Sequence, residues 1–300
     1  MAVYHTPVML DESLKALNIR SNGIYADLTF GGGGHSSAIL KVLKNGKLIV
    51  FDQDMDALAN IPDDKRLLPV HGNFRYLSNY LRYLDVDFLD GIIADLGVSM
   101  HQFDSHERGF TYRSDSRLDM RMNGDSDVTA ADVLNKYSHQ DLSTLFREYA
   151  DLQFPGRIAA AVVRYREQKS FVTSGQLVEC ISPFCKPSEK NKMLSRVFQA
   201  IRIEVNREFE ALSEMLPQAV THLKKEGRLV ILTYHSAEDR IVKNFFKTGN
   251  VEGIAETDIM GRKSGTSLKP VFNKPLIPAD DEISRNPAAR SAKLRAAEKV

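Results

Sequence analysis

Apolar and polar residues alternate along the first hundred positions in a way that predicts strands separated by helices. The short apolar stretches typical of buried strands lie at residues 24–30, 47–52, 66–74 (a strand with the loop after it) and 88–97. Apolar residues at helical spacing flank these stretches, at residues 10–17, 36–43 and 54–59. Strands that are apolar on both faces and alternate with helices indicate a parallel sheet covered on two sides. The expected fold class is α/β, with a Rossmann-like, mostly parallel sheet.

The middle third of the chain has a different pattern, made of helical segments without a convincing buried strand. A helix from Phe209 and a fifth strand at residues 228–234 then resume the α/β pattern. We therefore expect a core made of residues 1–103 and 206–300, interrupted by an all-helical insertion at residues 104–205.

Two features of the C-terminal third are predicted from local signals. Gly227 stands where a glycine ends a helix, and Ser236 with Asp239 has the spacing of a helix-capping box. The tail after Asn250 is rich in Gly, Ser, Pro and Lys. It is expected to form wide loops that end in a basic segment at residues 285–295.

The composition limits the class of protein but does not identify a binding partner. The 300 residues are 43% hydrophobic, and the formal net charge of +1 argues neither for nor against a nucleic-acid partner. The longest apolar runs have the length of strands, and the first residues show neither a signal peptide nor a transit peptide. We expect a cytoplasmic protein without a membrane segment.

Cysteine usage gives no hint of a metal or redox site. Cys180 and Cys185 are separated by four residues, a gap that fits no common zinc or redox signature. Two reduced thiols in the core are the simpler interpretation. No spaced cluster of His, Cys and Asp suggests a metal site, so no structural metal is expected.

The most informative stretch is residues 24–36, where a strand leads through four glycines into a helix. In this arrangement backbone N–H groups and the helix dipole face a ligand, which glycine allows to approach the main chain. A dinucleotide motif is disfavoured because Ser36 replaces its third glycine, and a P-loop because no lysine follows. Asp27 and the glycines give Asp-x-x-x-Gly-x-Gly, which resembles the first motif of class I S-adenosylmethionine-dependent methyltransferases.

A second acid is expected at the end of the next strand, where it would bond the ribose hydroxyls of the cofactor. Asp52 stands there, nineteen residues after Gly33. Ligands of parallel sheets bind at the carboxyl ends of the strands. The glycines, Asp52, Phe74 and Asp95 are therefore expected to converge on one site.

Further segments extend this resemblance over nearly the whole chain. They are 5–8 (His-Thr-Pro-Val), 29–36, 95–99 (Asp-Leu-Gly-Val-Ser), 108–110, 118–122 (Leu-Asp-Met-Arg-Met), 198–202, 235–240 (His-Ser-Ala-Glu-Asp-Arg) and 286–291. Together they resemble the bacterial small-subunit (16S) rRNA cytosine-N4 methyltransferase family (RsmH/MraW type). The resemblance implies S-adenosylmethionine as methyl donor and a cytidine in the decoding region of 16S rRNA as acceptor. It also implies a class I methyltransferase core interrupted by a helical domain.

The resemblance also implies which residues hold the cofactor. Residues 33–35 (Gly33, Gly34 and His35) are assigned to its methionine and ribose side, Asp52 to the ribose hydroxyls and Phe74 to the adenine. Asp95 and Gln102 complete the predicted site.

Two short stretches depart from the family pattern. Met100-His101 stands where a second Ser and a small residue are usual, and Ser116-Arg117 replaces a common Gly-Pro. The first departure changes the loop after Ser99, although Gln102 keeps its spacing from Asp95.

Methylating an exocyclic amine requires that the amine be aligned with the methyl group and that its N–H groups find acceptors. The aromatic and proline residues that many amino-methyltransferases place after the fourth strand are absent here. The acceptor is the Asp95 carboxylate, a loop carbonyl, or a group from His235-Ser236. Asp95 and His235 are thus the candidate catalytic residues, with a purely structural histidine as the alternative for His235.

The residues expected to contact RNA are aromatic or basic. Residues 157–202 carry nine Lys or Arg against three Glu, which is typical of a solvated face or of a surface that binds a polyanion. A base that leaves its stack needs an aromatic platform, for which Phe110, Tyr112 and Tyr234 are candidates. The candidate RNA contacts are Arg113, Arg117, Arg121, Tyr234, Arg240 and Arg290. In particular, Arg121→Ala is expected to weaken RNA methylation while cofactor affinity barely changes.

Alternative functions keep the same fold but change the partner. One is a methyltransferase that acts on DNA or on a protein amine, and another is a non-catalytic ribosome-assembly factor that keeps the cofactor as a ligand. A nicotinamide oxidoreductase is disfavoured by the missing third glycine. The sequence leaves open the oligomeric state, a homodimer included, and whether free rRNA or the small ribosomal subunit is the substrate.

Overall fold

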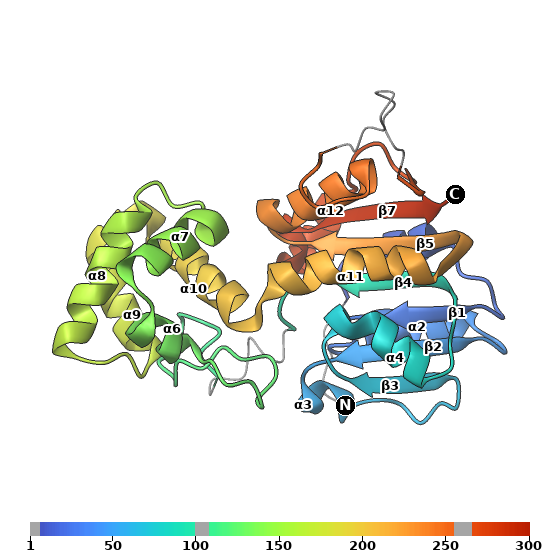
Figure 1. Cartoon of the computed structure of the whole chain (residues 1–300), viewed down its shortest axis with the longest axis horizontal. Helices are drawn as coiled ribbons and strands as arrows, with labels where there is room; N and C mark the ends of the chain where they lie inside the picture. The colour runs from blue at the N-terminus through green and yellow to red at the C-terminus, as the bar shows by residue number, and fades with distance from the viewer. Residues whose placement is uncertain (1–6, 100–107, 255–265) are drawn as a thin grey trace, which may run out of the picture. The chain divides into compact units, whose positions relative to one another are not determined.

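The computed structural model describes residues 7–99, 108–254 and 266–300. The chain divides into two compact units, residues 1–97 with 209–300, and residues 98–208 (Figure 1). The boundaries lie a few residues from those expected at 103/104 and 205/206. Gln102 lies outside the described residues.

A seven-stranded sheet forms the frame of the first unit. Its strands stand in the order β3 (Leu67–His71), β2 (Lys47–Asp52), β1 (Ile24–Asp27), β4 (Leu89–Asp95), β5 (Leu223–Thr233), β7 (Lys293–Lys299) and β6 (Leu268–Pro270). The first five are parallel, whereas β7 runs antiparallel to β5 and β6. The predicted α/β class with a mostly parallel sheet is confirmed.

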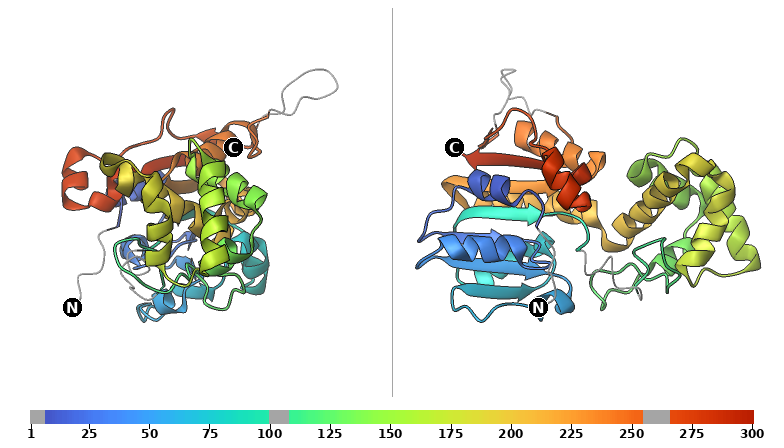
Figure 2. Two further views of the ribbon diagram at one scale, coloured as in Figure 1. Left: turned by 90° about the vertical axis from the view of Figure 1, so that its left-hand side faces the viewer. Right: turned by 180° about the vertical axis from the view of Figure 1, so that it is seen from behind.

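Helices cover both faces of this sheet (Figures 1 and 2). One face buries apolar residues under α4 (Leu77–Tyr83), α11 (Glu208–His222) and α12 (Ser236–Thr248). The other is covered by α1 (Leu10–Leu17), α2 (Gly34–Val42), α3 (Met55–Leu58) and the 3₁₀ turn η4 (Pro287–Ser291). Two further short elements are η1 (Phe74–Tyr76) and α13 (Asp280–Arg285). Burial on both faces explains why the parallel strands are nearly continuous apolar runs in the sequence.

The prediction that the tail after Asn250 forms only loops is wrong, because β7 lies beside β5 within the sheet. The sequence Lys-Leu-Arg-Ala-Ala-Glu-Lys has no β-branched or aromatic residue and therefore a weak strand signal. Its apolar residues Leu294, Ala296 and Ala297 are buried. Its charged residues are paired, Arg295 with Asp239 and Glu298 with Arg228.

Gly227 does not end a helix. Helix α11 stops at His222 and β5 begins at the next residue, so Gly227 lies inside the strand. The pairing of β5 with β4 shifts register there, and Glu226 has a φ of 66°. A Cβ at Gly227 would stand 2.8 Å from the carbonyl oxygen of Lys224, so the irregular strand start requires a glycine.

The second unit is helical in the part that the structure describes, apart from an isolated bridge between Arg117 and Thr173. Its helices are α6 (Ala130–Lys136), α7 (His139–Ala150), α8 (Pro155–Gln168), α9 (Ser174–Ile181) and α10 (Lys190–Asn206), with 3₁₀ turns η2 (Ser182–Phe184) and η3 (Pro187–Glu189). Capping boxes at Thr129, Ser138 and Thr173 fix the starts of α6, α7 and α9. Apolar residues from all five helices form one core cluster, which includes Leu134, Phe146, Val162, Leu177 and Val197.

Among the described residues, no helix is both long and apolar enough to cross a membrane. Within the same residues, no group of three or more His, Cys, Asp or Glu is arranged to hold a metal ion. Cys180 and Cys185 are both unpaired thiols.

Asp239 joins α12 to β7 and offers a test of this packing. Its carboxylate accepts hydrogen bonds from Arg295 Nε at 2.6 Å and Lys293 Nζ at 3.2 Å. Burial alone would raise the pKa of Asp239, but these two cations lower it below its ordinary value. We predict that Asp239→Asn lowers the free energy of unfolding by about 2 kcal/mol at pH 7.

The stabilisation from a carboxylate with a lowered pKa is present above the pKa of the unfolded chain and is lost as pH falls through the folded pKa. The difference between wild type and Asp239→Asn should therefore shrink below about pH 4. Denaturant titration at several pH values measures it. Asp281→Asn removes an ion pair with Arg285 that is more than two-thirds exposed, so it should change stability by less than about 0.5 kcal/mol. Equal effects of the two substitutions would contradict this account.

Candidate active site

The glycine loop connects β1 to α2. Gly31 has a φ of 52° and Gly33 a φ of 74°, both in the left-handed region. A Cβ at Gly33 would lie 2.9 Å from Phe30 Cζ, so a side chain there would clash as well as strain the backbone. Gly33 is also the N-cap of α2 and offers no side-chain cap to its first turn. The N–H groups of that turn therefore lack the side-chain partner that most helix starts have.

Asp27 holds this loop from within the protein. Its Oδ1 accepts from the backbone N–H of Thr29 at 3.1 Å, and its Oδ2 accepts from Ser36 Oγ at 2.6 Å. The residue is only 2% exposed, and burial raises the pKa of Asp27. The acid of the methyltransferase motif thus ties the end of β1 to the start of α2.

Asp52 ends β2 beside this loop. Its Oδ2 accepts from the N–H of Gly31 at 2.8 Å and its Oδ1 from the N–H of Asp54 at 2.9 Å. Burial raises the pKa of Asp52 to about 6, although both hydrogen bonds lower it. Each carboxylate oxygen keeps a second lone pair, so Asp52 is able to accept from two ligand hydroxyls.

Gly34 and Phe74, both predicted to hold the cofactor, also lie against other parts of the protein. A Cβ at Gly34 would lie 2.8 Å from Pro7 Cγ, so its missing side chain makes room for Pro7. Phe74 starts η1 after β3 and packs, partly buried, against the core on the α4 side of the sheet.

Asp95 ends β4 and has a protein partner on each carboxylate oxygen. The Tyr234 hydroxyl donates to Oδ1 at 2.6 Å, and His35 Nδ1 lies 3.7 Å from Oδ2. The backbone N–H of Asp95 donates to Thr29 Oγ1 at 2.6 Å. His35 Nε2 lies 3.1 Å from the carbonyl oxygen of Val8, and since a carbonyl only accepts, Nε2 carries a proton. The Asp95 side chain is 23% exposed, so it is held firmly and is still accessible.

Electrostatics at this carboxylate are set by four neighbours. Burial raises the pKa of Asp95, as do the charges of Asp27 and Glu238, whereas His35 and Tyr234 lower it. Burial and the negative charge of Asp95 hold the pKa of Tyr234 well above its ordinary value. The phenol therefore keeps its proton and remains a donor to Asp95.

His235 is the N-cap of α12. Its Nδ1 accepts from the N–H of Glu238 at 3.4 Å, and its Nε2 stands 2.9 Å from Glu238 Oε1. Glu238 Oε2 accepts in turn from the N–H of Tyr234 at 3.0 Å. The imidazole is 12% exposed and is folded back on its own helix. The predicted cap by Ser236 with Asp239 is wrong, because His235 caps the helix and Asp239 binds β7.

The predicted RNA contacts differ in their surroundings. Arg113, Arg117, Arg240 and Arg290 have exposed side chains. Phe110 is buried in the core of the second unit, and Tyr112 packs edge-on against Phe198. Tyr234 uses its hydroxyl on Asp95.

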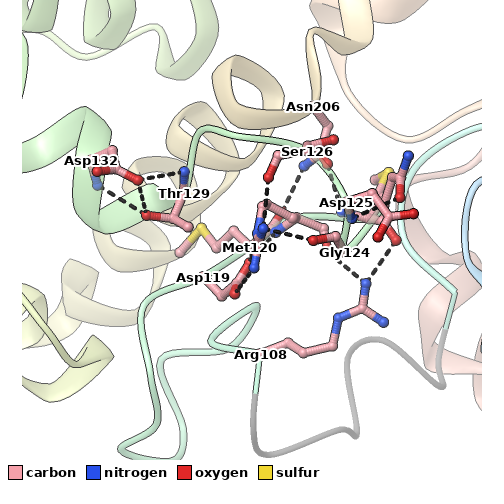
Figure 3. A network of polar contacts seen from close by, with 12 residues as sticks. Arg108, Asp119, Met120, Gly124, Asp125, Ser126, Thr129, Asp132 and Asn206 are labelled. Atoms are coloured by element: carbon pink, nitrogen blue, oxygen red, sulfur yellow. Dashed lines mark hydrogen bonds and ion pairs between the residues drawn. The ribbon is translucent and has the colours of Figure 1, made fainter.

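The guanidinium of Arg121 forms hydrogen bonds within its own loop. Its Nε donates to Asp119 Oδ1 at 2.7 Å, and its Nη1 donates to the carbonyls of Gly124 and Ser126 at 2.7 and 2.6 Å. Asn206 at the end of α10 accepts from the N–H of Met122 at 2.7 Å and donates to the carbonyl of Met120 at 2.8 Å; Figure 3 shows this network. The Leu-Asp-Met-Arg-Met segment is therefore a loop fastened to α10. The donors of Arg121 thus serve this loop, and its predicted contact with RNA phosphate stays a prediction.

Sequence reasoning missed the links that hold Asp95. Neither the Tyr234 hydroxyl nor Thr29 Oγ1 had been expected as its partner. No spacing in the sequence indicates either, since Tyr234 is 139 positions from Asp95. Thr29 gives the only local hint, because it follows the acid of the glycine motif.

A profile of the MraW methylase family matches residues 2–300. The chain belongs to this family. It is 52% identical over 297 residues to a protein of Bacteroides thetaiotaomicron named ribosomal RNA small subunit methyltransferase H, with 99% of this chain and 97% of that protein covered. Proteins of the same name from Parabacteroides distasonis and Porphyromonas gingivalis are 51% and 49% identical, covering 99% and 100% of this chain and 98% of each relative. The chain is thus a methylase of the class I fold, and S-adenosylmethionine is its methyl donor.

The raised pKa of Asp52 predicts how cofactor affinity changes with pH. The predicted ligands of Asp52 are the ribose hydroxyls of the cofactor, which would donate to the ionised carboxylate, and Asp52 takes up its proton as pH falls through about 6. We predict that S-adenosylmethionine binds about tenfold more weakly at pH 5 than at pH 8. Calorimetric titration measures this, with Asp52→Asn as control, which should bind weakly at both pH values. A wild-type affinity that is the same at pH 5 and pH 8 would refute the role of Asp52.

The loop network predicts a structural effect of Arg121→Ala. The substitution leaves Asp119, whose side chain is 13% exposed, without its cation, and frees two carbonyls. The free energy of unfolding should fall by about 3 kcal/mol. Arg113→Ala, at an exposed arginine, should change it by less than about 0.5 kcal/mol. Denaturant unfolding of both variants measures the difference, and equal stabilities would count against the network.

Proposed function

We propose that this chain transfers a methyl group to N4 of a cytidine in the decoding region of small-subunit (16S) rRNA. The observation that carries the proposal is the identity of about half its residues, end to end, with relatives named ribosomal RNA small subunit methyltransferase H. We place the reaction in the cytoplasm, where ribosomal subunits are. The substrate is the rRNA, free or within the small subunit.

The carboxyl edge of the parallel strands suits S-adenosylmethionine in four respects. Asp52 offers oxygens to the ribose hydroxyls, and the uncapped first turn of α2, residues 34–36, offers N–H groups to the methionine carboxylate. Phe74 follows β3 on the side proposed for the adenine. Asp27, Asp52 and Asp95 together make this edge negative, which favours a ligand that bears a positive sulfonium. Gln102 remains a contact predicted from the family resemblance.

Asp95 is the proposed acceptor for the target amine. Bound S-adenosylmethionine supplies an electrophilic methyl group. Asp95 accepts a hydrogen bond from the amine N–H, so that electron density stays on the nitrogen as it forms its bond to carbon. The Tyr234 hydroxyl fixes Oδ1, and His35 stands beside Oδ2. The carboxylate therefore faces the amine in one orientation. The surplus proton of the amine has Asp95 as its nearest acceptor.

His235 caps α12 and its ring nitrogens lie near Glu238, although Nε2 has no hydrogen-bond partner among the described residues. Its catalytic role stays a prediction, and no step of this scheme depends on it. We propose the helical insertion as the unit that recognises RNA. Of the nine basic residues at 157–202, Arg166 donates to backbone carbonyls and Arg202 pairs with Glu208. The cations with exposed side chains are Arg157, Arg164, Lys169, Lys186, Lys190 and Lys192.

The function is tested by transfer of labelled methyl from S-adenosylmethionine to unmethylated small subunits, protein-free 16S rRNA and DNA, followed by nucleoside analysis. We expect N4-methylcytidine from rRNA or subunits and none from DNA. Label on another nucleoside, on DNA or on ribosomal protein would keep the fold and cofactor but discard the substrate. Cofactor binding without transfer to any of them would favour an assembly factor.

Tyr234→Phe tests how Asp95 is held. Without the hydroxyl, ionised Asp95 loses a donor, so its pKa rises further, and activity that needs the carboxylate should decline at a higher pH than in wild type. We predict a fall in kcat of about tenfold near pH 7, with cofactor affinity unchanged. The pH dependence of kcat measures both effects. Tyr83→Phe, at a tyrosine that is 86% exposed, is the control. A Tyr234→Phe profile that coincides with wild type would contradict the positioning role.

A further inference from the structure

The solvent face of α12 carries only positive charge. Its exposed residues are Ser236, Arg240, Lys243 and Lys247. Spacings of three and four residues place the three cations on one side of the helix. The two acids of this helix are turned inward, since Glu238 is 2% and Asp239 9% exposed.

These cations have no counter-ion among the residues that the structure describes. Within that part of the chain, no carboxylate lies within ion-pair distance of Arg240, Lys243 or Lys247. The neighbouring cations differ, because Lys293 and Arg295 of β7 are both bound to Asp239. The charge on the face of α12 is therefore available to a partner.

The row of cations starts close to the proposed reacting group. Helix α12 begins two residues after Tyr234, whose hydroxyl donates to Asp95. At about 1.5 Å per residue, Arg240 lies roughly 6 Å and Lys247 roughly 16 Å along the helix from Ser236. The positive face thus extends away from the end of the helix that adjoins the site.

We propose that this face of α12 is a track for the phosphate backbone next to the target cytidine, a proposal that rests on the function given above. Three cations in a row, without a counter-ion in the described part of the chain, match a linear polyanion, whereas a small anion would need donors that converge on one point. The family resemblance pointed to Arg240 alone; Lys243 and Lys247 belong to none of its motifs. Part of the RNA contact is thereby assigned to the methyltransferase core.

The test variant replaces all three cations by glutamine: Arg240→Gln, Lys243→Gln and Lys247→Gln. A matched control makes the same charge change on three exposed lysines of the same unit, at the end of α2, in the loop after it and at the start of β2: Lys41→Gln, Lys44→Gln and Lys47→Gln. A third variant keeps the charge: Arg240→Lys, Lys243→Arg and Lys247→Arg. The KM for unmethylated small subunits and for protein-free 16S rRNA is measured over a series of KCl concentrations at constant Mg²⁺, together with kcat and the Kd for S-adenosylmethionine.

In the glutamine variant we expect the KM for both substrates to rise about tenfold at 0.1 M salt, and the slope of log KM against log salt to fall by about 2. Its kcat and its Kd for the cofactor should stay at wild-type values, because these side chains do not reach the reacting groups. The control and the charge-retaining variant should behave as wild type.

Three results would overturn the proposal. The KM of the α12 glutamine variant could equal that of the lysine control, which would mean that total charge, and not the face of α12, determines the affinity for RNA. It could lose affinity for subunits but keep it for protein-free rRNA, which would make the partner a ribosomal protein. If the wild type itself binds cofactor but methylates neither substrate, the proposed function fails first, and the track fails with it.

Discussion

Hydrogen bonds to three aspartates at the ends of parallel strands hold the loops on which the site depends. Asp27 accepts from Thr29 and Ser36, and Asp52 accepts from Gly31. These two carboxylates fasten the glycine loop between β1 and α2, and the Asp95 carboxylate accepts from Tyr234, the residue that follows β5. Because β2, β1 and β4 are neighbours, the three carboxylates lie at one edge of the sheet, and their burial there raises the pKa values of Asp27, Asp52 and Asp95. Loop geometry and affinity for a cationic cofactor therefore have one physical origin.

The fold could be predicted from the sequence where the deciding signal is local. Strands β1, β2, β4 and the second half of β5 are buried on both faces, so each appears as a compact apolar run. Strand β7 could not be found in this way, because Lys293–Lys299 is a strand only by its pairing with β5, some sixty positions earlier. The prediction for Gly227, at the start of β5, was wrong for a related reason. A glycine that ends a helix and one that fits an irregular strand look alike in sequence.

The candidate site also has features that the sequence predicts and features that it does not predict. The glycine spacing and the positions of Asp52 and Asp95 at strand ends came from the sequence, because the topology of parallel sheets brings such ends together. The contacts that each side chain makes could not be predicted from the sequence. Arg121 looked like a phosphate contact, yet its partner is Asp119, two residues away. His235 looked like a candidate for catalysis, yet it caps α12. A motif identifies residues that matter without separating those that build a loop from those that meet a ligand.

The central claim is that Asp95, oriented by Tyr234 and His35, is the group that meets the target amine. The most direct measurement is the single-turnover rate of methyl transfer by Asp95→Asn at saturating cofactor, beside its Kd for S-adenosylmethionine. Asparagine keeps the shape but loses the charge and one acceptor oxygen. We predict a rate at least about a hundredfold lower at saturating cofactor, with a smaller rise in Kd because the negative charge of Asp95 is lost. A normal rate, or a loss explained entirely by weaker cofactor binding, would contradict it.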